Sequence, residues 1–331
     1  MQTIIPPIEK SVLRSELKPE MLLRKTNRAD NEIYIFQAHE APNLMREVGR
    51  LREEAFRYYG GGSGLETDTD RFDYEGGYKQ IIVWDPEEEK ILGGYRFICG
   101  EHVPTNDGVP DLASAHMFSF SQEFITDYLP YTIELGRSFV SLSCQSTLPD
   151  SSVSSSKGIF ALDNLWDGVG ALPLLYPEYR YFFGKVTMYK GYNRYCRDII
   201  IFLLSKYYSD PKQLVRPIEE VPYTTPVEAL SEILHYDTFE ENYKAVNRLV
   251  REYGINIPPL INSYVQIAKQ LVFYGTAINR HFSDVEESAI LLPFAGINEE
   301  KLRRHVESFI RDCALRYKKR LHRSESDGNL S

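Results

Sequence analysis

The sequence predicts an α/β protein in which helices flank a mixed central sheet and a helical extension follows at the C-terminal end. Between residues 31 and 208, β-strand patterns alternate with helical periodicity in the order strand, helix, three strands, helix, strand, helix. From Thr238 onward the pattern is mostly helical. The 331 residues, 43% of them hydrophobic, are enough for a large core in one elaborated domain or two.

The chain begins with a polar, proline-bearing stretch at 1–30, which we interpret as an arm. Alternating apolar residues at 31–38 predict the first strand. At 41–59, apolar residues recur at three- and four-residue spacing and predict an amphipathic helix. The stretches 78–85 and 90–100 are β-prone and joined by the acidic turn PEEE, which is the pattern of a hairpin.

The next predicted elements are a strand at 131–140, a helix opened by Lys157 and Gly158, a strand at 179–189 and a largely buried helix at 193–208. The expected division of the chain is an arm (1–30), a core domain (31–237), a helical extension packed on or continuing this domain (238–323) and a disordered tail (324–331).

Composition excludes several classes of protein. The N-terminal stretch has no sustained apolar run, and no run in the sequence reaches transmembrane length, so we expect neither a secretion signal nor a membrane span. The four cysteines show no CxxC spacing and no nearby histidine cluster, which argues against a zinc site or a disulfide framework. A net charge of −9 disfavours general nucleic-acid binding. We expect a cytoplasmic protein with no bound metal.

One segment is basic within this acidic chain. Residues 301–323 hold nine Lys or Arg against Glu307 and Asp312. Two interpretations stand: a solvated basic helix, or a surface that docks on an acidic partner or on anionic lipid head groups.

The strand at 131–140 carries Glu134 and Arg137 in a stretch otherwise apolar enough to be buried. A buried charge must be paired or functional. Strict alternation would place the two side chains on opposite faces, but a β-bulge near Gly136 would turn both toward one cleft. An internal ion pair and a catalytic pair are both consistent with this pattern.

Several motifs in order extend this pattern. They are LREEAF with Arg52 and Phe56, DRFD with Asp70 and Asp73, GGYRF with Arg96, the aromatic residues Phe118 and Phe120, and ELGR with Glu134 and Arg137. Together they resemble the acyl-transfer branch of the GNAT N-acetyltransferase fold, which includes acyl-homoserine lactone synthases and ornithine-lipid N-acyltransferases. Some members carry the label "haemolysin-like". Over residues 31–295 the chain is most similar to enzymes that make N-acylated amino-acid lipids, glycine lipids in particular.

The resemblance implies a role for each matched residue. Glu134 would be the general base, and Arg137 and Arg96 would orient the site and the acceptor carboxylate. Asp70 and Asp73 would hold the acceptor ammonium or fix Arg52 and Arg96, while Arg52 would contact substrate or be structural. Phe56, Phe118 and Phe120 would line the acyl path.

The resemblance also implies the donor and partners. The chain lacks the phosphate loop of acetyl-CoA users, and the serine-rich stretch after 140 ends at Lys157 and Gly158, which would bind a phosphopantetheine arm. We therefore expect a 3-hydroxy fatty acyl group to move from acyl carrier protein, or from CoA, to the amine of glycine or ornithine. No tightly bound cofactor is expected. Peripheral contact with the inner membrane face is a further expectation.

Other functions remain open at this point. An acyl-homoserine lactone synthase would keep the fold and use S-adenosylmethionine as acceptor, although the extension after residue 238 argues against it. A non-enzymatic haemolysin-like lipid-binding protein, or a nucleic-acid binder, would use the basic segment 301–323.

Overall fold

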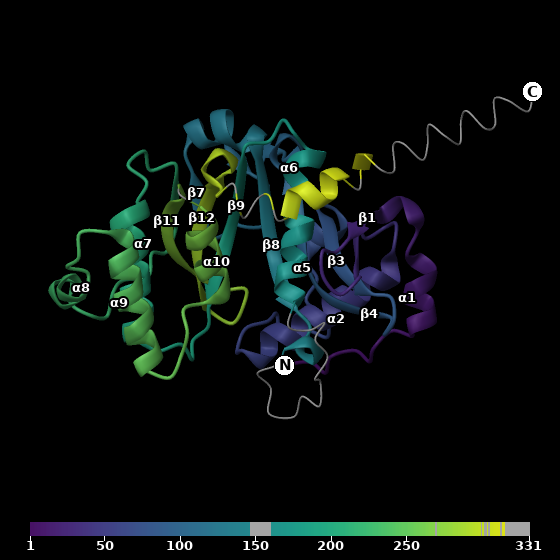
Figure 1. The fold of residues 1–331 in the computed structure, drawn as a ribbon, viewed down its shortest axis with the longest axis horizontal. Coiled ribbons are helices and arrows are strands. Elements are labelled where there is room, and N and C mark those ends of the chain that lie inside the picture. The colour runs from purple at the N-terminus through teal and green to yellow at the C-terminus, as the bar shows by residue number, and fades with distance from the viewer. Residues whose placement is uncertain are drawn as a thin grey trace, which may run out of the picture.

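The computed structural model describes residues 1–145, 160–268, 270–298, 300, 303, 305–311 and 313–314. Its centre is an eight-stranded mixed sheet with strand order β1-β2-β3-β4-β8-β9-β12-β11 (Figure 1). Neighbouring strands are antiparallel except β8 and β9, which run parallel. The predicted α/β class with a mixed sheet is confirmed.

The eight strands of this sheet are β1 (Leu22–Lys25), β2 (Glu32–Phe36), β3 (Lys79–Asp85), β4 (Lys90–Cys99), β8 (Thr132–Val140), β9 (Tyr181–Met188), β11 (Val272–Asn279) and β12 (Val285–Pro293). Two small ribbons pair β5 (Thr105–Asn106) with β6 (Val109–Pro110) and β7 (Phe118–Phe120) with β10 (Val215–Pro217).

The α-helices include α1 (Lys10–Glu16), α2 (Pro42–Tyr58), α3 (Arg71–Tyr74), α5 (Ala161–Val169), α6 (Leu172–Leu175), α7 (Arg194–Tyr208), α8 (Val227–Ile233), α9 (Phe239–Glu252) and α10 (Pro259–Ile267). Of these, none is long and apolar enough to cross a membrane.

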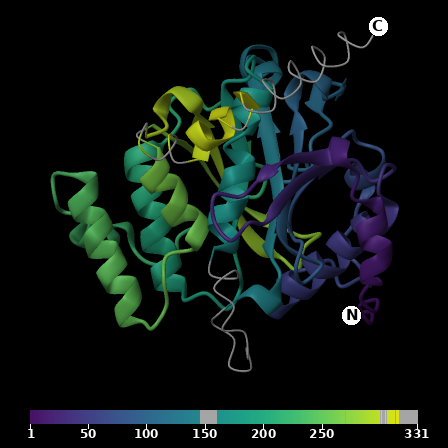
Figure 2. The same cartoon turned by 45° about the vertical axis from the view of Figure 1, so that its right-hand side comes forward.

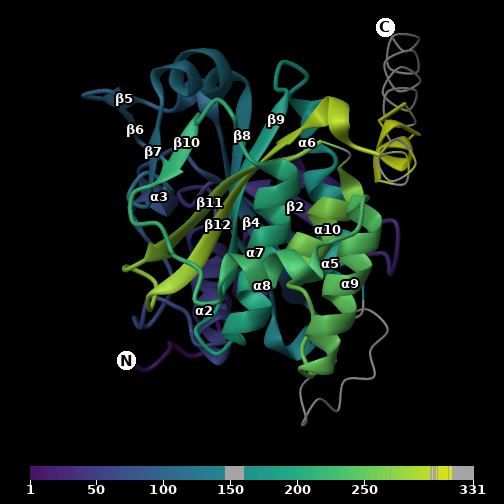
Figure 3. The ribbon, with the colours of Figure 1, turned by 90° about the vertical axis from the view of Figure 1, so that its left-hand side faces the viewer.

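Both faces of the sheet are covered because its central strands are apolar on both sides. On β3, Ile81 and Val83 pack with residues of α5, α7 and α10, whereas Ile82 and Trp84 pack with α2. Figure 3 looks onto the face covered by α7 and α10, and Figure 2 separates these green helices from the purple N-terminal ones.

Strand β8 contains the predicted bulge. Gly94 and Arg96 of β4, two positions apart, pair with Phe139 and Gly136 of β8, three positions apart. The extra residue lies between Gly136 and Phe139, and Arg137 has a φ of 50°, in the left-handed region. The bulge is therefore centred on Arg137, one residue after the expected Gly136.

Strands β8 and β9 pair over only half of their lengths. The parallel register joins Thr132–Leu135 to 181–184, although β8 continues to Val140 and β9 to Met188. Beyond Leu135 and Gly184 the two strands are no longer paired, which opens the sheet at its centre.

Two expectations about the ends of the chain are wrong in part. The predicted arm includes β1, which pairs with β2 at the sheet edge. The predicted helical extension includes the hairpin β11–β12, and β12 pairs with β9 along the whole of β9. The hairpin forms because β12 pairs with β9, a strand roughly a hundred residues earlier. Local periodicity does not report such distant pairing, so the sequence predicted helix where the chain forms strands.

We predict that Gly100→Ala destabilises the fold. An added Cβ would lie 1.8 Å from the backbone oxygen of Leu129, a contact that forces the backbone to move. We expect a loss of about 1–3 kcal/mol or more in the free energy of unfolding, measured by urea denaturation.

The matched control is Gly191→Ala, where a Cβ would meet no described heavy atom within 4 Å. Its free energy of unfolding should stay within about 0.5 kcal/mol of the parent. Equal stability of the two variants would contradict the predicted clash.

Candidate active site

A cleft of about 680 Å³ lies where β8 and β9 part. Residues of both strands line it, together with the end of α2, the stretch 256–260 that leads into the first turn of α10, and Phe282. Four of the predicted site residues are among its described lining: Glu134, Arg137, Arg96 and Phe56. The structure thus brings the predicted catalytic residues to one cavity.

Glu134 is held at the wall of this cleft by a tyrosine. Its side chain is buried, and its Oε2 accepts a hydrogen bond from the Tyr78 hydroxyl. The same hydroxyl accepts the backbone N–H of Ala113 at 2.9 Å. Burial, and then the charge of Glu134, raise the pKa of Tyr78 well above its ordinary value. Tyr78 therefore remains a hydrogen-bond donor to the carboxylate at neutral pH.

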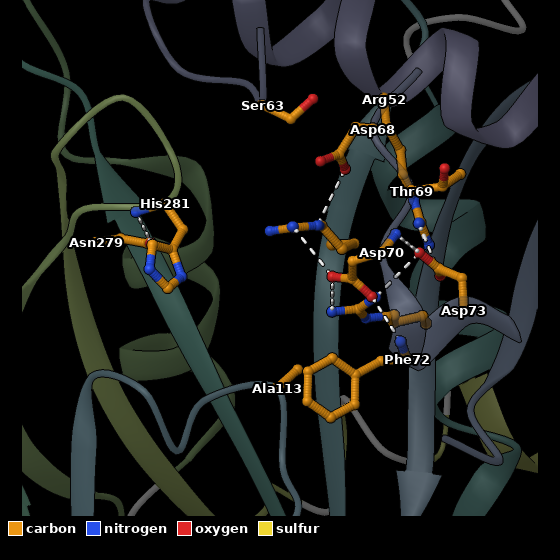
Figure 4. A network of polar contacts seen from close by, with 12 residues as sticks. Arg52, Ser63, Asp68, Thr69, Asp70, Phe72, Asp73, Ala113, Asn279 and His281 are labelled. Carbon is orange, nitrogen blue, oxygen red and sulfur yellow. Dashed lines mark hydrogen bonds and ion pairs between the residues drawn. The ribbon is translucent and has the colours of Figure 1, made fainter. Parts of the chain in front are cut away.

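Arg96 is bound by two aspartates. Its Nη1 and Nη2 donate to the Asp70 carboxylate at 2.6 and 3.0 Å, and Nη1 lies 3.1 Å from Asp73 Oδ2. Burial acts to raise the pKa values of Asp70 and Asp73, but the neighbouring arginines outweigh it and hold both below the ordinary value. Both carboxylates are thus ionised partners of Arg96. Figure 4 shows Asp70 and Asp73 within the network of polar contacts.

Arg137 contacts the acidic segment 67–73, which carries Asp68 as well as Asp70 and Asp73. Its Nε lies 3.0 Å from Asp68 Oδ2, and its Nη2 donates to Asp70 at 3.4 Å. Its guanidinium also lies over the ring of Phe282, 4.8 Å from the centroid. Burial raises the pKa of Asp68, and the charge of Arg137 offsets this only in part. The bulge of β8 aims Arg137 at this loop as well as at the cleft.

Arg52 completes the group from α2. It is fully buried, and it donates to Asp73 at 3.0 Å and to the side chain of Gln80 at 2.6 Å. We call the following six residues the arginine–aspartate cluster: Arg52, Arg96, Arg137, Asp68, Asp70 and Asp73. The cluster ties α2, β4 and β8 to the acidic loop, and so fixes the wall that carries Glu134.

Known proteins similar to the chain include two glycine N(alpha)-acyltransferases. A glycine N(alpha)-acyltransferase of Phocaeicola vulgatus is 49% identical over 313 residues, which cover 94% of each chain. A glycine N(alpha)-acyltransferase of Bacteroides thetaiotaomicron is 51% identical over 312 residues, which cover 94% of this chain and 91% of the relative. The family model "Acetyltransferase (GNAT) domain" matches residues 51–148. The chain belongs to the GNAT acyltransferase family.

This enzyme is an N-acyltransferase, as the resemblance predicted. The family model spans the second half of α2, the arginine–aspartate cluster and β8, the strand that carries Glu134. No solved structure matches the chain.

Arg52 and Asp73 of this acyltransferase are buried and lie outside the described cleft lining, as does the half-buried Asp70. The sequence left two roles open for Asp70 and Asp73: to hold the acceptor ammonium or to fix the arginines. In the structure both aspartates form ion pairs with arginines. The geometry of Arg52 is that of a structural residue.

The predicted acyl path is only partly matched. Phe56 lines the cleft, but Phe118 and Phe120 are absent from its described lining. Strand β7 carries them into a separate apolar cluster with Phe124 and Phe183, because it pairs with β10 and not with the main sheet. The expectation that Phe118 and Phe120 line this cleft is therefore wrong.

The cleft contains a second polar group that was not predicted from the sequence. Lys185 of β9 and Glu287 of β12 both line it, and Asn279 of β11 donates to Glu287 at 2.8 Å. The signal was present: Glu286 and Glu287 interrupt the otherwise apolar run VEESAILL. A buried charge in a β-prone run marks a paired or functional group, as it did for Glu134.

Two predicted features lie outside the described residues. They are the proposed phosphopantetheine contacts Lys157 and Gly158, and most of the basic segment 301–323.

We predict that Asp70→Asn weakens the acid dependence of stability. A carboxylate with a depressed pKa contributes stability that is fully present above its ordinary pKa of 3.8 and is lost as pH falls through the folded value. The parent should therefore lose more free energy of unfolding on acidification than Asp70→Asn, and should be the more stable protein at neutral pH.

Urea denaturation between about pH 3 and pH 7 measures this difference. The control is Asp107→Asn, which changes an exposed turn residue and should keep the parental dependence on pH. Parallel stability curves for the parent and Asp70→Asn would contradict the stabilising pairing of Asp70 with Arg96.

Proposed function

We propose that this N-acyltransferase moves a 3-hydroxy fatty acyl group from the phosphopantetheine thioester of acyl carrier protein to the amine of glycine, the first step of an amino-lipid synthesis. The observation that carries the proposal is a buried carboxylate, Glu134, at the wall of a large apolar cleft. The two relatives, each near 50% identical, are glycine N(alpha)-acyltransferases, which supports glycine as acceptor.

Glu134 would act as general base. An amino acid arrives with its nitrogen protonated, and only the free amine can attack a carbonyl carbon. Glu134 would take that proton, directly or through a water molecule, while Tyr78 keeps the carboxylate oriented. The amine then attacks the thioester carbon, and the C–S bond breaks as the tetrahedral intermediate collapses. The nitrogen loses a second proton as the amide forms, and this proton passes to the departing thiolate. The products are an amide and a thiol, and the proton taken by Glu134 is released to solvent.

The cleft supports a long acyl group. Its lining includes the apolar side chains of Phe56, Phe282, Val186, Ile257 and Leu260. The opening between β8 and β9 leaves backbone groups of both strands unpaired with each other beyond Leu135 and Gly184. Backbone N–H groups at this opening would stabilise the oxyanion of the intermediate and receive the amide groups of a phosphopantetheine arm.

We predict that Glu134→Gln lowers kcat by about 10²- to 10⁴-fold, because the base is removed while the shape of the side chain is kept. The assay mixes purified enzyme with 3-hydroxyacyl-acyl carrier protein and glycine, and quantifies N-acylglycine by mass spectrometry. Parallel reactions with acyl-CoA and with ornithine identify the donor and the acceptor.

Glu228→Gln is the matched control, since Glu228 is an exposed residue of α8 outside the described cleft lining. It should keep parental turnover, and both variants should keep the parental unfolding midpoint. Near-normal turnover of a folded Glu134→Gln enzyme would refute the base assignment.

The basic segment 301–323 is our proposed docking surface for acyl carrier protein, which is acidic. We predict that replacing Arg316, Lys318, Lys319 and Arg320 by Gln raises the KM for the carrier at low salt and leaves the KM for glycine unchanged. Added salt should reduce the difference between variant and parent. An unchanged KM for the carrier at low salt would contradict this docking role. It would favour binding of the segment to another surface, such as anionic lipid.

A further inference from the structure

Three strands carry a row of polar side chains, two of which, Lys185 and Glu287, line the cleft. On β9 and β12, Thr187 pairs with Glu287 and Lys185 with Ala289, so Lys185 and Glu287 are diagonal neighbours on one face. On β11, Ala277 pairs with Glu287 and Asn279 with Val285, which makes Asn279 the next diagonal neighbour. The row is therefore formed by residues of three neighbouring strands, β9, β12 and β11.

The row lies on the same face of the sheet as the base. In the parallel pair, Glu134 is opposite Phe183, and the pairing ends at the next step, Leu135 and Gly184. Lys185 is two residues after Phe183 and so points to the face of Phe183 and Glu134. Its ammonium enters the cleft where the strands begin to part.

The contacts of Lys185 leave donors for a ligand. Its Nζ lies 3.4 Å from Glu287 Oε2, longer than the 2.7–2.9 Å typical of a charge-assisted hydrogen bond. Glu287 is also occupied by Asn279, whose Nδ2 donates to Oε1 at 2.8 Å. An ammonium carries three N–H donors, and this side chain retains 12% of its exposure.

The other cations of the described cleft lining are already bound to carboxylates. Arg96 is held by Asp70 and Asp73, and only 3% of its side chain is exposed. Arg137 contacts Asp68 and Asp70. An anionic group entering the cleft would have to compete with two aspartates for either arginine. At Lys185 the anionic group would compete with one carboxylate, that of Glu287, whose contact with the ammonium is long.

We propose that Lys185 binds the carboxylate of the amino-acid acceptor, and that Glu287 and Asn279 position its ammonium. This inference rests on the proposed function. It moves the acceptor carboxylate from Arg96 and Arg137, where the sequence placed it, to a lysine on the opposite side of the opening. A carboxylate held there leaves the amine of the same small molecule free to turn toward Glu134.

The supporting residues are themselves fixed. Asn279 Oδ1 accepts the backbone N–H of His281 at 3.2 Å (Figure 4). The same oxygen lies 3.2 Å from His116 Nε2, and these contacts orient the amide nitrogen of Asn279 toward Glu287. The rings of His116 and His281 stack with centroids 4.9 Å apart. Asn279 therefore fixes Oε1 of the Glu287 carboxylate, while Oε2 faces Lys185.

The test compares glycine with glycinamide, an acceptor that has the same amine and no carboxylate. Lys185→Met keeps the aliphatic stem and removes the charge. We expect it to raise the KM for glycine by about 10- to 100-fold, the value of one lost charge-assisted hydrogen bond. Turnover of glycinamide and the KM for the acyl donor should change by less than about twofold by the same argument. Lys185→Arg should restore part of the glycine affinity.

Two further variants make the result decisive. Lys190→Met removes an exposed lysine that pairs with Asp284 outside the described cleft lining, and should match the parent. Lys185→Met combined with Glu287→Gln leaves no unpaired buried charge, and serves if Lys185→Met alone does not fold.

An equal loss of activity toward glycine and glycinamide, or a loss confined to the donor KM, would overturn the inference. An absence of N-acylglycine from the parent enzyme would instead overturn the proposed function, and this inference with it.

Discussion

The arginine–aspartate cluster is the constraint on which the rest of the site depends. It holds three guanidinium groups, those of Arg52 and Arg96 buried and that of Arg137 partly buried, and each is neutralised by at least one carboxylate of the segment 67–73. Removing one partner of a buried pair costs about 3–5 kcal/mol, because the other charge stays buried. The cluster therefore fixes α2 and β4 against the bulged strand β8, and the bulge in turn fixes where Glu134 and Arg137 point.

The parted strands β8 and β9 turn this rigid wall into a cleft with two chemically distinct sides. One side carries the carboxylate of Glu134 and its tyrosine partner, and the other carries the row that begins at Lys185. In the roles that we propose for them, a base and an anion-binding group face one cavity, which suits an acceptor that has an amine and a carboxylate. Apolar residues between and beyond them suit the fatty acyl group of the donor.

Much of the core was predictable because local patterns and tertiary structure agree there. The predicted strand at 131–140 is β8, and the buried charges of Glu134 and Arg137 marked the cleft. The C-terminal hairpin β11–β12 was not predictable, since its pairing with β9 lies far away in sequence. The place of Phe118 was not predictable either, because an aromatic residue near the site looks the same in sequence whether it lines the cleft or fills a separate core.

The most direct test of the central claim is to incubate the purified enzyme with 3-hydroxyacyl-acyl carrier protein and a mixture of the twenty amino acids in which only glycine is isotopically labelled. Mass spectrometry of the lipid extract then reports the acceptor. The account predicts one main product, an N-acylated amino acid that carries the label. An unlabelled N-acylated product would contradict glycine as acceptor, and an intact thioester without any product would contradict acyl transfer from this carrier.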